Sequence, residues 1–337
     1  MTDLLPSLVD SPPDLTGKVI LVTGGTGSFG QAFVRRLLDA HDPAKVIVFS
    51  RDEQKHHTMS QTFRDKRLRF FIGDVRDRER MMRALTGVDI VVHSAAMKHV
   101  SIAEYNPLEA IRTNIDGATN VIDAAIERGV QRVVALSTDK ACSPVNLYGA
   151  TKLCMEKLFV AANSLAGAAD TRFNLVRYGN VVGSKGSVVP LFQQQKLEGT
   201  LTLTEPAMTR FWISMDQAID LVMLALKEGH GGEVFIPKIP ACTVETLALA
   251  MAPEAEHKVI GIRPGEKMHE SLITLDEAHN VLEYDRHYII LPNFPFWGGE
   301  PRTDGTRLPE GFHYTSAVAD QLDVPQVREL LTALGFI

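Results

Sequence analysis

Cysteine is scarce in this sequence, and long apolar runs are missing. The three cysteines, Cys142, Cys154 and Cys242, show no CxxC or histidine-rich spacing. We therefore expect neither a metal site nor a disulfide framework, and a reducing compartment. No apolar run reaches about 18 residues, the length that spans a membrane. Residues 1–18 also lack the basic and apolar segments of a signal peptide. These absences predict a cytoplasmic protein with no membrane partner.

An excess of positive charge is missing as well. The 337 residues carry a formal net charge of −6, so no basic field is available to attract nucleic acid. The hydrophobic content of 45% and the charged content of 23% are those of a globular protein. A chain of this length can bury a large core in one or two domains.

A glycine-rich turn follows the first apolar strand, which runs from Lys18 to Thr23. The motif TGGTGSFG occupies residues 23–30, and a helical pattern comes next. Strand, glycine turn and helix form the context of a dinucleotide fingerprint, in which glycines let the backbone approach a pyrophosphate. The alternative is a glycine-rich turn with no ligand. The residues predicted to hold the cofactor here are Gly24, Thr26, Gly27, Ser28, Phe29 and Gly30.

The end of the second strand, residues 46–49, bears on the choice of cofactor. Ser50 and Arg51 come first after it, and Asp52 follows. A hydroxyl and a guanidinium suit a 2′-phosphate, which favours NADP. Asp52 leaves NAD open, because an acidic residue here can hold a ribose 2′-hydroxyl. A solvated loop charge is the alternative for Arg51.

Two more strand ends carry candidate cofactor residues. Asp74 and Val75 follow the strand at 68–72, where an Asp can accept a hydrogen bond from an adenine amino group. The strand at 90–93 is followed by SAAMKHV. There Ala95 and Ala96 are small enough to allow close approach of the cofactor, and Lys98 can reach cofactor or substrate.

Strands and helices alternate with short connections up to residue 178, which predicts an α/β fold with a doubly wound parallel sheet. Ligands of such a sheet lie beyond the carboxyl ends of its strands. We expect a loose lead-in at 1–16, a cofactor-binding domain at 17–178, and a mainly substrate-binding part with a tail at 179–337. Some segments of the last part should return to the first domain. The later elements are predicted as helices near 190–198 and 216–228, strands near 201–203, 210–213 and 233–237, and a packed amphipathic helix at the end.

The stretch STDKACSPVNLYGATK at 137–152 holds two chemical devices. Tyr148 and Lys152 are four residues apart and so share one face of a helix, where the ammonium should lower the pKa of the phenol. Such a phenol can take a proton from a sugar hydroxyl while hydride leaves the same carbon. Asp139 and Lys140 form a second acid/base pair.

Further polar residues are candidates for surface, structural or binding roles. His56 and His57 are interpreted as surface residues, because adjacent histidines on a helix point to different faces. A long helix is expected from Glu104 onward, with Asn114 in its middle. Arg210 and Arg263 lie near turns, where they can clamp a diphosphate or be unrelated surface arginines.

The glycine motif and the Tyr148–Lys152 pair resemble the extended short-chain dehydrogenase/reductases that modify nucleotide sugars. Asp139-Lys140 stands where most sugar 4,6-dehydratases carry Asp-Glu. STDKA, NLYGATKL, MKHVSIAEYNP, RYGNVVGSKGSVVP, MTRFWIS and IRPGEKMHE together are similar to the inverting UDP-N-acetylglucosamine 4,6-dehydratases. The resemblance covers roughly residues 17–290. Ser94 and Met97 depart from it, since relatives often carry Ala and Leu there.

The resemblance implies a Rossmann-type sheet with a smaller C-terminal α/β substrate domain, bound NADP, a UDP-sugar substrate and a homo-oligomer, dimeric or hexameric. It implies that Tyr148, assisted by Lys152, takes the O4 proton, and that Lys140 takes the C5 proton. The pKa of Lys140 is expected to be lowered by burial and by Lys152. Protonated Asp139 would donate to the departing O6 hydroxyl, and Thr138 would hold O4 or the nicotinamide. The residues implied for the UDP-sugar are Lys98, Asn180, Val181, Arg210, Arg263 and Glu266.

Three other functions remain open from the sequence. A 4,6-dehydratase that retains C5 and a 4-epimerase share the glycine turn and the Tyr148–Lys152 pair. Asp139-Lys140 argues against an epimerase, which needs no acid/base pair at C5 and C6. A non-catalytic NADP-binding scaffold is disfavoured by the retained Tyr148–Lys152 pair, although the fold alone does not exclude it. The product of an inverting enzyme would enter the route to pseudaminic acid and related glycans.

Overall fold

The main sheet of the protein is formed by near-continuous apolar strands. The computed structural model describes residues 4–167, 169–184, 186–293 and 302–337. The sheet has the order β16-β14-β15-β10-β6-β5-β4-β1-β2-β3, and its strands from β10 to β3 are parallel. The predicted doubly wound parallel sheet is therefore confirmed. The parallel strands are β1 (Val19–Thr23), β2 (Lys45–Ser50), β3 (Leu68–Ile72), β4 (Ile90–His93), β5 (Arg132–Leu136), β6 (Arg172–Val176) and β10 (Val234–Pro237).

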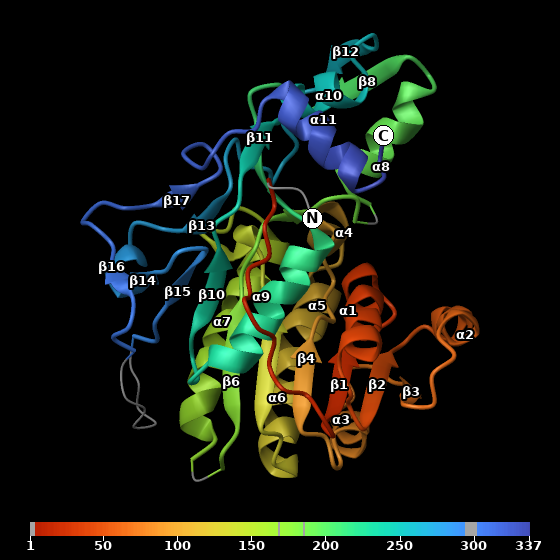
Figure 1. The fold of residues 1–337 in the computed structure, drawn as a ribbon, viewed down its shortest axis with the longest axis vertical. Coiled ribbons are helices and arrows are strands. Elements are labelled where there is room, and N and C mark those ends of the chain that lie inside the picture. Colours follow the sequence, from red (N-terminus) through yellow and green to blue (C-terminus); the bar gives the residue numbers. More distant parts are fainter. Residues whose placement is uncertain (1–3, 168, 185, 294–301) are drawn as a thin grey trace.

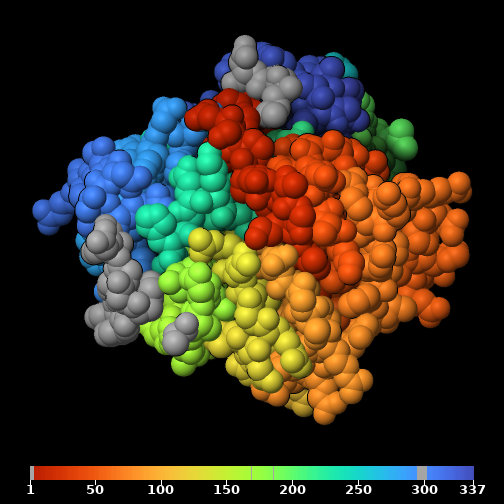
Figure 2. All heavy atoms as spheres, turned by 60° about the horizontal axis from the view of Figure 1, so that its bottom comes forward, coloured from red at the N-terminus to blue at the C-terminus, as the bar shows by residue number. Residues whose placement is uncertain are grey.

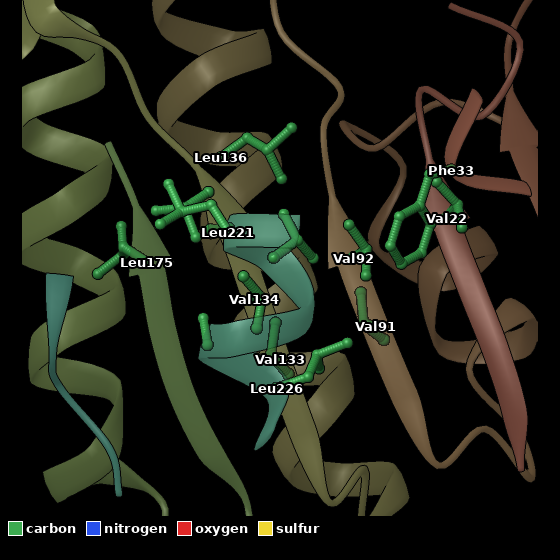
Figure 3. Packing of buried hydrophobic residues seen from close by; sticks show 14 of the residues in the cluster. Val22, Phe33, Val91, Val92, Val133, Val134, Leu136, Leu175, Leu221 and Leu226 are labelled. Atoms are coloured by element: carbon green, nitrogen blue, oxygen red, sulfur yellow. The ribbon is translucent and has the colours of Figure 1, made fainter. Parts of the chain in front are cut away.

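Helices cover both faces of this sheet (Figure 1). Helices α1 (Ser28–Ala40) and α9 (Met215–Glu228) pack together, and α3 (Arg78–Ala84), α6 (Gly117–Arg128) and α7 (Leu147–Leu165) pack in a second row. Helix α2 (Glu53–Thr62) lies beside the edge strand β3. Strands covered on both faces need apolar residues at consecutive positions, as in RVVAL of β5. Figure 3 shows Val133 and Val134 within the core formed in this way.

The N-terminal lead-in is not loose in its described part, contrary to expectation. Leu5, Leu8 and Leu15 are buried, and the Ser7 hydroxyl donates a 2.6 Å hydrogen bond to Asp220 of α9. Figure 2 shows this segment in red beside the teal α9. The prolines of this segment prevent a helical pattern, which suggested a loose chain. Its spaced leucines nevertheless hold it in place, because they are buried in the two hydrophobic cores.

A smaller part of the protein has a core of its own beyond the carboxyl ends of the parallel strands (Figure 1). Helix α11 packs against α10 there, which confirms the packing role predicted for the last helix. The predicted elements after residue 179 are confirmed, with bounds that shift by up to two residues. The elements of this part are β7 (Asn180–Val181), α8 (Val188–Lys196), β8 (Thr200–Leu203), β9 (Thr209–Ile213), β11 (Ala241–Thr243), α10 (Val244–Met251), β12 (Glu256–Val259) and α11 (Val324–Ala333).

Later segments return to the main sheet, as the sequence predicted. Strand β15 pairs antiparallel with β10, and β14 and β16 follow it at the edge. These strands are β14 (Val281–Glu283), β15 (His287–Ile290) and β16 (Thr306–Arg307), and a separate pair joins β13 (Ser271–Ile273) to β17 (Tyr314–Thr315). Within the described residues, no helix has the length and apolar character that crossing a membrane requires.

The long helix predicted to open at Glu104–Pro107 begins at Pro107 in the structure and runs without a gap to Arg128, after a separate short helix. Helix α4 (Val100–Tyr105) ends at Asn106, because Pro107 has no backbone N–H to continue it. Helix α5 (Pro107–Ile111) then runs through a π-helical turn (Arg112–Asp116) into α6. This turn carries Asn114 towards the site described next.

Candidate active site

A cavity of about 1420 Å³ opens where the parallel strands end and extends to the smaller part of the protein. Its walls come from the glycine turn, the loops after β2, β3, β4 and β5, the start of α7, and segments of the smaller part. This is the position at which a doubly wound sheet binds its ligands.

The glycine turn forms one end of the cavity, with no room for side chains on two of its glycines. A Cβ on Gly24, whose φ is +65°, would lie 2.9 Å from the Ala95 nitrogen, and one on Gly30 would lie 2.5 Å from the Gly25 Cα. Helix α1 begins at Ser28, directly after the N-cap Gly27. Its first N–H groups have no intrahelical acceptors, so this end fits the pyrophosphate of a dinucleotide. Every residue predicted at this turn lines the cavity: Gly24, Thr26, Gly27, Ser28, Phe29 and Gly30.

A short hydrogen-bond chain lies next to the turn, at the end of β2. The Ser50 hydroxyl is 2.9 Å from Thr26 Oγ1 and 2.8 Å from His56 Nε2. His56 is only 4% exposed, so its interpretation as a surface residue is wrong. The reason is that Asp52 caps α2 and turns the helix so that His56 packs under Ser50. Burial lowers the pKa of His56, which keeps the imidazole neutral at pH 7.

Arg51 and Asp74 face each other across this end of the cavity, which both of them line. The Arg51 guanidinium is 3.7 Å from Asp74 and is 60% exposed. Asp74 also accepts two hydrogen bonds from the Arg76 guanidinium, so arginines neutralise the carboxylate predicted to face adenine. Val75 lines the cavity beside it.

The loop after β4 is held in place by Asn114. Its amide accepts from the Met97 N–H at 2.8 Å and donates to the Met97 carbonyl and to Thr151 of α7. Ser94 donates to the Thr23 carbonyl at 2.7 Å, which explains how a serine is accommodated where an alanine was expected. Ala95, Ala96 and Lys98 line the cavity, and burial lowers the pKa of Lys98.

Tyr148 lies in the first turn of α7, which Asn146 caps. The expectation of a lowered pKa is wrong, because the pKa of Tyr148 is raised to about 12. Burial disfavours the phenolate more strongly than the Lys140 charge and a hydrogen bond with Thr138 favour it.

Lys152 lies one turn further along α7 and is 3% exposed. Its ammonium donates to the Leu136 carbonyl at 2.6 Å, which ties the helix to the end of β5. Burial lowers the pKa of Lys152 to about 8, although the Glu156 carboxylate opposes the shift. Tyr148 and Lys152 thus share a buried helix face, as the spacing predicted.

Asp139 and Lys140 begin the 3-10 turn Asp139–Ala141, which Thr138 caps. Lys140 Nζ lies 3.0 Å from Asp139 Oδ1 and 3.5 Å from Glu270 Oε1. Burial lowers the pKa of Lys140, but these two carboxylates outweigh it and raise the pKa well above its usual range. The expectation of a lowered pKa is therefore wrong. Lys152 is not the neighbour that sets the charge of Lys140.

Glu270 was not singled out from the sequence. It is the last residue of the motif IRPGEKMHE, and its side chain is only 3% exposed at the wall of the cavity. That motif was the only signal that could have found it, because nothing in the local pattern places it beside Lys140.

The residues implied for the UDP-sugar reach the same cavity from separate elements. Asn180 and Val181 form β7, and the Asn180 side chain lies 3.5 Å from Lys140 Nζ. Arg210 of β9 donates to the Met268 carbonyl at 3.2 Å, while Arg263 is exposed. The structure thus brings both arginines to one cavity, together with Glu266.

The chain matches the family described as "Polysaccharide biosynthesis protein" over residues 20–292. It is 52% identical over 309 residues to the UDP-N-acetylglucosamine 4,6-dehydratase (inverting) of Campylobacter jejuni subsp. jejuni serotype O:23/36 (strain 81-176). That match covers 89% of this chain and 92% of the relative. It is 40% identical to the UDP-glucose 4-epimerase of Rickettsia conorii, over 95% and 97% of the two chains.

Solved structures give the same fold. The X-ray structure of Pen from Bacillus thuringiensis has a TM-score of 0.88 at 40% identity, over 95% of this chain and 100% of that one. DesIV, a dTDP-glucose 4,6-dehydratase from Streptomyces venezuelae with NAD bound, has a TM-score of 0.66 at 29% identity, over 74% and 86%. The chain therefore belongs to the polysaccharide biosynthesis protein family, within the extended short-chain dehydrogenase/reductases that include the inverting UDP-N-acetylglucosamine 4,6-dehydratases.

Proposed function

We propose that this protein is a hydro-lyase that converts UDP-N-acetylglucosamine to UDP-2-acetamido-2,6-dideoxy-β-L-arabino-hexos-4-ulose, with loss of water and inversion at C5. The observation that carries the proposal is one cavity lined by Tyr148, Lys152 and Lys140, with the buried Asp139 carboxylate 3.0 Å from Lys140 Nζ as the second member of an acid/base pair. The 52% identity to a relative named for this reaction supports it. In this proposal residues 17–178 hold the cofactor and residues 179–337 mainly bind the substrate.

The first step belongs to Tyr148. A nicotinamide dinucleotide held along the glycine turn would supply a hydride acceptor for C4 of the sugar and a hydride donor for C6. Tyr148 takes the O4 proton as the ketone forms, and Thr138 positions that oxygen. Since burial raises the pKa of Tyr148, the phenolate depends on positive charge nearby, and Lys140 supplies it in the structure. Lys152 fixes the helix that presents the phenol.

The second step belongs to Asp139 and Lys140. The 4-ketone acidifies the proton at C5, which a neutral amine can remove. Moving one proton across the 3.0 Å hydrogen bond from Lys140 Nζ to Asp139 Oδ1 leaves a neutral amine and a protonated acid. Those are the two forms that elimination requires. Lys140 then takes the C5 proton, and Asp139 protonates the departing O6 hydroxyl, which leaves as water. Hydride addition at C6 and protonation of C5 on the face opposite the one that lost its proton would complete the product with inversion.

NADP is proposed as the cofactor in preference to NAD. Ser50 and Arg51 line the cavity next to the glycine turn, where the ribose 2′ position of a dinucleotide lies in this fold. Lys55 lines the same end and adds a second positive charge. The resemblance further suggests a cytoplasmic homo-oligomer, dimeric or hexameric, that feeds the synthesis of pseudaminic acid-type glycans.

Proton NMR of the purified protein with UDP-N-acetylglucosamine and NADP in D2O tests the function. A 6-methyl signal, deuterium at C5 and the L-arabino configuration are expected. A D-xylo product would keep the reaction class but refute the inversion. A galacto product with intact C6 would make the protein a 4-epimerase, the function for which the Rickettsia relative is named. Bound cofactor without turnover of any nucleotide sugar would favour a scaffold.

A further inference from the structure

Lys140 lies between two carboxylates that come from distant parts of the chain. Asp139 precedes it in the 3-10 turn after β5, and Glu270 comes from the segment before β13. Lys140 Nζ is 3.0 Å from Asp139 Oδ1 and 3.5 Å from Glu270 Oε1. The mechanism above uses Asp139 and Lys140 and assigns nothing to Glu270.

The position of Glu270 is fixed by its backbone. Its N–H donates to the Ser316 hydroxyl at 2.9 Å, and its carbonyl accepts from the Ser316 N–H at 2.8 Å. The second carboxylate oxygen, Oε2, is buried and has no hydrogen-bond partner among the described residues; Lys267 Nζ lies 3.9 Å from it. A carboxylate desolvated in this way costs free energy that packing alone does not require.

Charged groups from three separate segments act on Lys140. Asp139 and Glu270 raise its pKa, whereas burial and the Arg210 guanidinium of β9 lower it. Tyr148 of α7 and Lys267 are the other titratable groups of this cluster. The Arg210 guanidinium therefore opposes the Lys140 ammonium, and Glu270 is the carboxylate from outside its own turn that favours it.

We propose that Glu270 is a positioning residue whose negative charge keeps one proton shared between Asp139 and Lys140 at working pH. The proposal deepens the proposed function and rests on it. The pair is active only with one proton, because elimination needs a neutral amine and a protonated acid together. With two protons the amine cannot act as a base, and with none the acid cannot donate. Without the negative charge of Glu270 the pair would lose its last proton at lower pH.

The pH profile of dehydration reports on this role, because two coupled groups that share one proton give a bell-shaped rate. Replacing Glu270 by Gln keeps the shape of the side chain and removes its charge. Both limbs of the bell should move to lower pH, by about one unit or more, as for loss of an opposite charge within roughly 4–6 Å. The profiles of the wild type and Glu270→Gln should therefore cross, with the variant slower on the alkaline side.

A purely structural role predicts a different result, because a displaced Lys140 would slow the reaction by the same factor at every pH. Glu270→Asp retains the charge and should keep the profile near that of the wild type, even if the rate falls. The control is Glu283→Gln, which removes a carboxylate from an ion pair with Lys238, outside the cavity lining, and should leave the profile unchanged. Folding of each variant is checked by circular dichroism and thermal melting.

The level of reduced cofactor shows which step a substitution slows. The fraction of reduced cofactor that accumulates before water is lost measures the C5 step separately from the C4 step of Tyr148. If wild-type protein dehydrates the sugar but the profile of Glu270→Gln keeps its position, the role of Glu270 is refuted alone. If the wild type does not dehydrate UDP-N-acetylglucosamine, the proposed function itself fails.

Discussion

Arg177 and Glu156 are joined in the interior by two hydrogen bonds, from Nε to Oε1 at 3.0 Å and from Nη2 to Oε2 at 2.6 Å. Both side chains are 2% exposed. The same guanidinium donates to Glu277, which precedes β14. Arg177 of the β6 end thus links α7, which carries Tyr148 and Lys152, to the segment that follows Glu270.

Removing Arg177 should destabilise the whole protein. Arg177→Met leaves Glu156 and Glu277 without their cation, and breaking a buried ion pair costs about 3–5 kcal/mol. Denaturant unfolding followed by circular dichroism measures this loss. Lys238→Met breaks a partly exposed pair with Glu283 and should cost about 0–1 kcal/mol. Equal losses in the two variants would contradict the role given to the Arg177 network.

Tyr148→Phe should stop the reaction before any reduced cofactor forms. Without the phenol, no group of the proposed mechanism receives the O4 proton, and general base catalysis contributes about 10²–10⁴-fold. Absorbance of the reduced nicotinamide in single-turnover experiments reports the step. Tyr105→Phe, on a side chain 87% exposed, is the control and should be silent. Rapid cofactor reduction in Tyr148→Phe would remove Tyr148 from the chemistry.

Asp139→Asn should separate proton removal at C5 from loss of water. The variant loses the carboxylate that takes the Lys140 proton, but it also loses one of the two charges that raise the pKa of Lys140. A neutral Lys140 should therefore form at alkaline pH, where recovered UDP-sugar should still acquire deuterium at C5 from D2O. The departing hydroxyl loses its acid, and dehydration should fall by about 10²–10⁴-fold. Mass spectrometry and proton NMR follow both products. Dehydration at the wild-type rate would show that another group protonates the leaving oxygen.

Arg51→Ala should weaken NADP binding far more than NAD binding. A hydrogen bond to a charged group is worth about 1.5–3 kcal/mol, which corresponds to roughly 10- to 100-fold in the Kd for NADP. Isothermal titration calorimetry with each cofactor gives the comparison. Arg64→Ala, an exposed arginine outside the cavity, is the matched control. An equal loss for both cofactors would mean that Arg51 does not contact a 2′-phosphate.

Stability should fall as the solution is acidified below pH 6.5, because two buried histidines stay neutral in the folded protein. Burial lowers the pKa of His93 to about 3 and that of His287 to about 4, from 6.5. The unfolded chain binds their protons first, so the stability present above pH 6.5 is lost as the pH falls. Each histidine contributes a slope of up to about 1.4 kcal/mol per pH unit.

Urea unfolding at pH 7, 6 and 5 measures this slope. His93→Gln should reduce it by the share of one histidine, whereas His57→Gln, at an exposed position, should leave it unchanged. If the slope of stability against pH is unaltered in His93→Gln, folding does not lower the pKa of His93.

Local patterns predicted the sheet and the glycine turn, because both are written in consecutive residues. TGGTGSFG predicts a turn wherever it follows an apolar strand, and RVVAL predicts a buried parallel strand. The pKa of Tyr148 was mispredicted because burial outweighs the positive charge near the phenol. The pKa of Lys140 was mispredicted because Glu270, distant in sequence, adds to the effect of Asp139 and outweighs burial. Glu270 lies beside Lys140 because its backbone is hydrogen-bonded to Ser316, which is distant in sequence, and no local pattern predicts that contact. His56 was misjudged because the cap of α2 decides which way the histidine faces.

The chain passes repeatedly between the main sheet and the smaller part. It leaves after β6, returns in α9 and β10, leaves again for β11, α10 and β12, and returns once more in β14 and β15 before ending in α11. A chimera of two relatives joined at a single point would therefore pair non-matching faces in both cores. Exchanging sugar specificity between family members would instead require several junctions, and point changes in the cavity wall offer the simpler route to a new substrate.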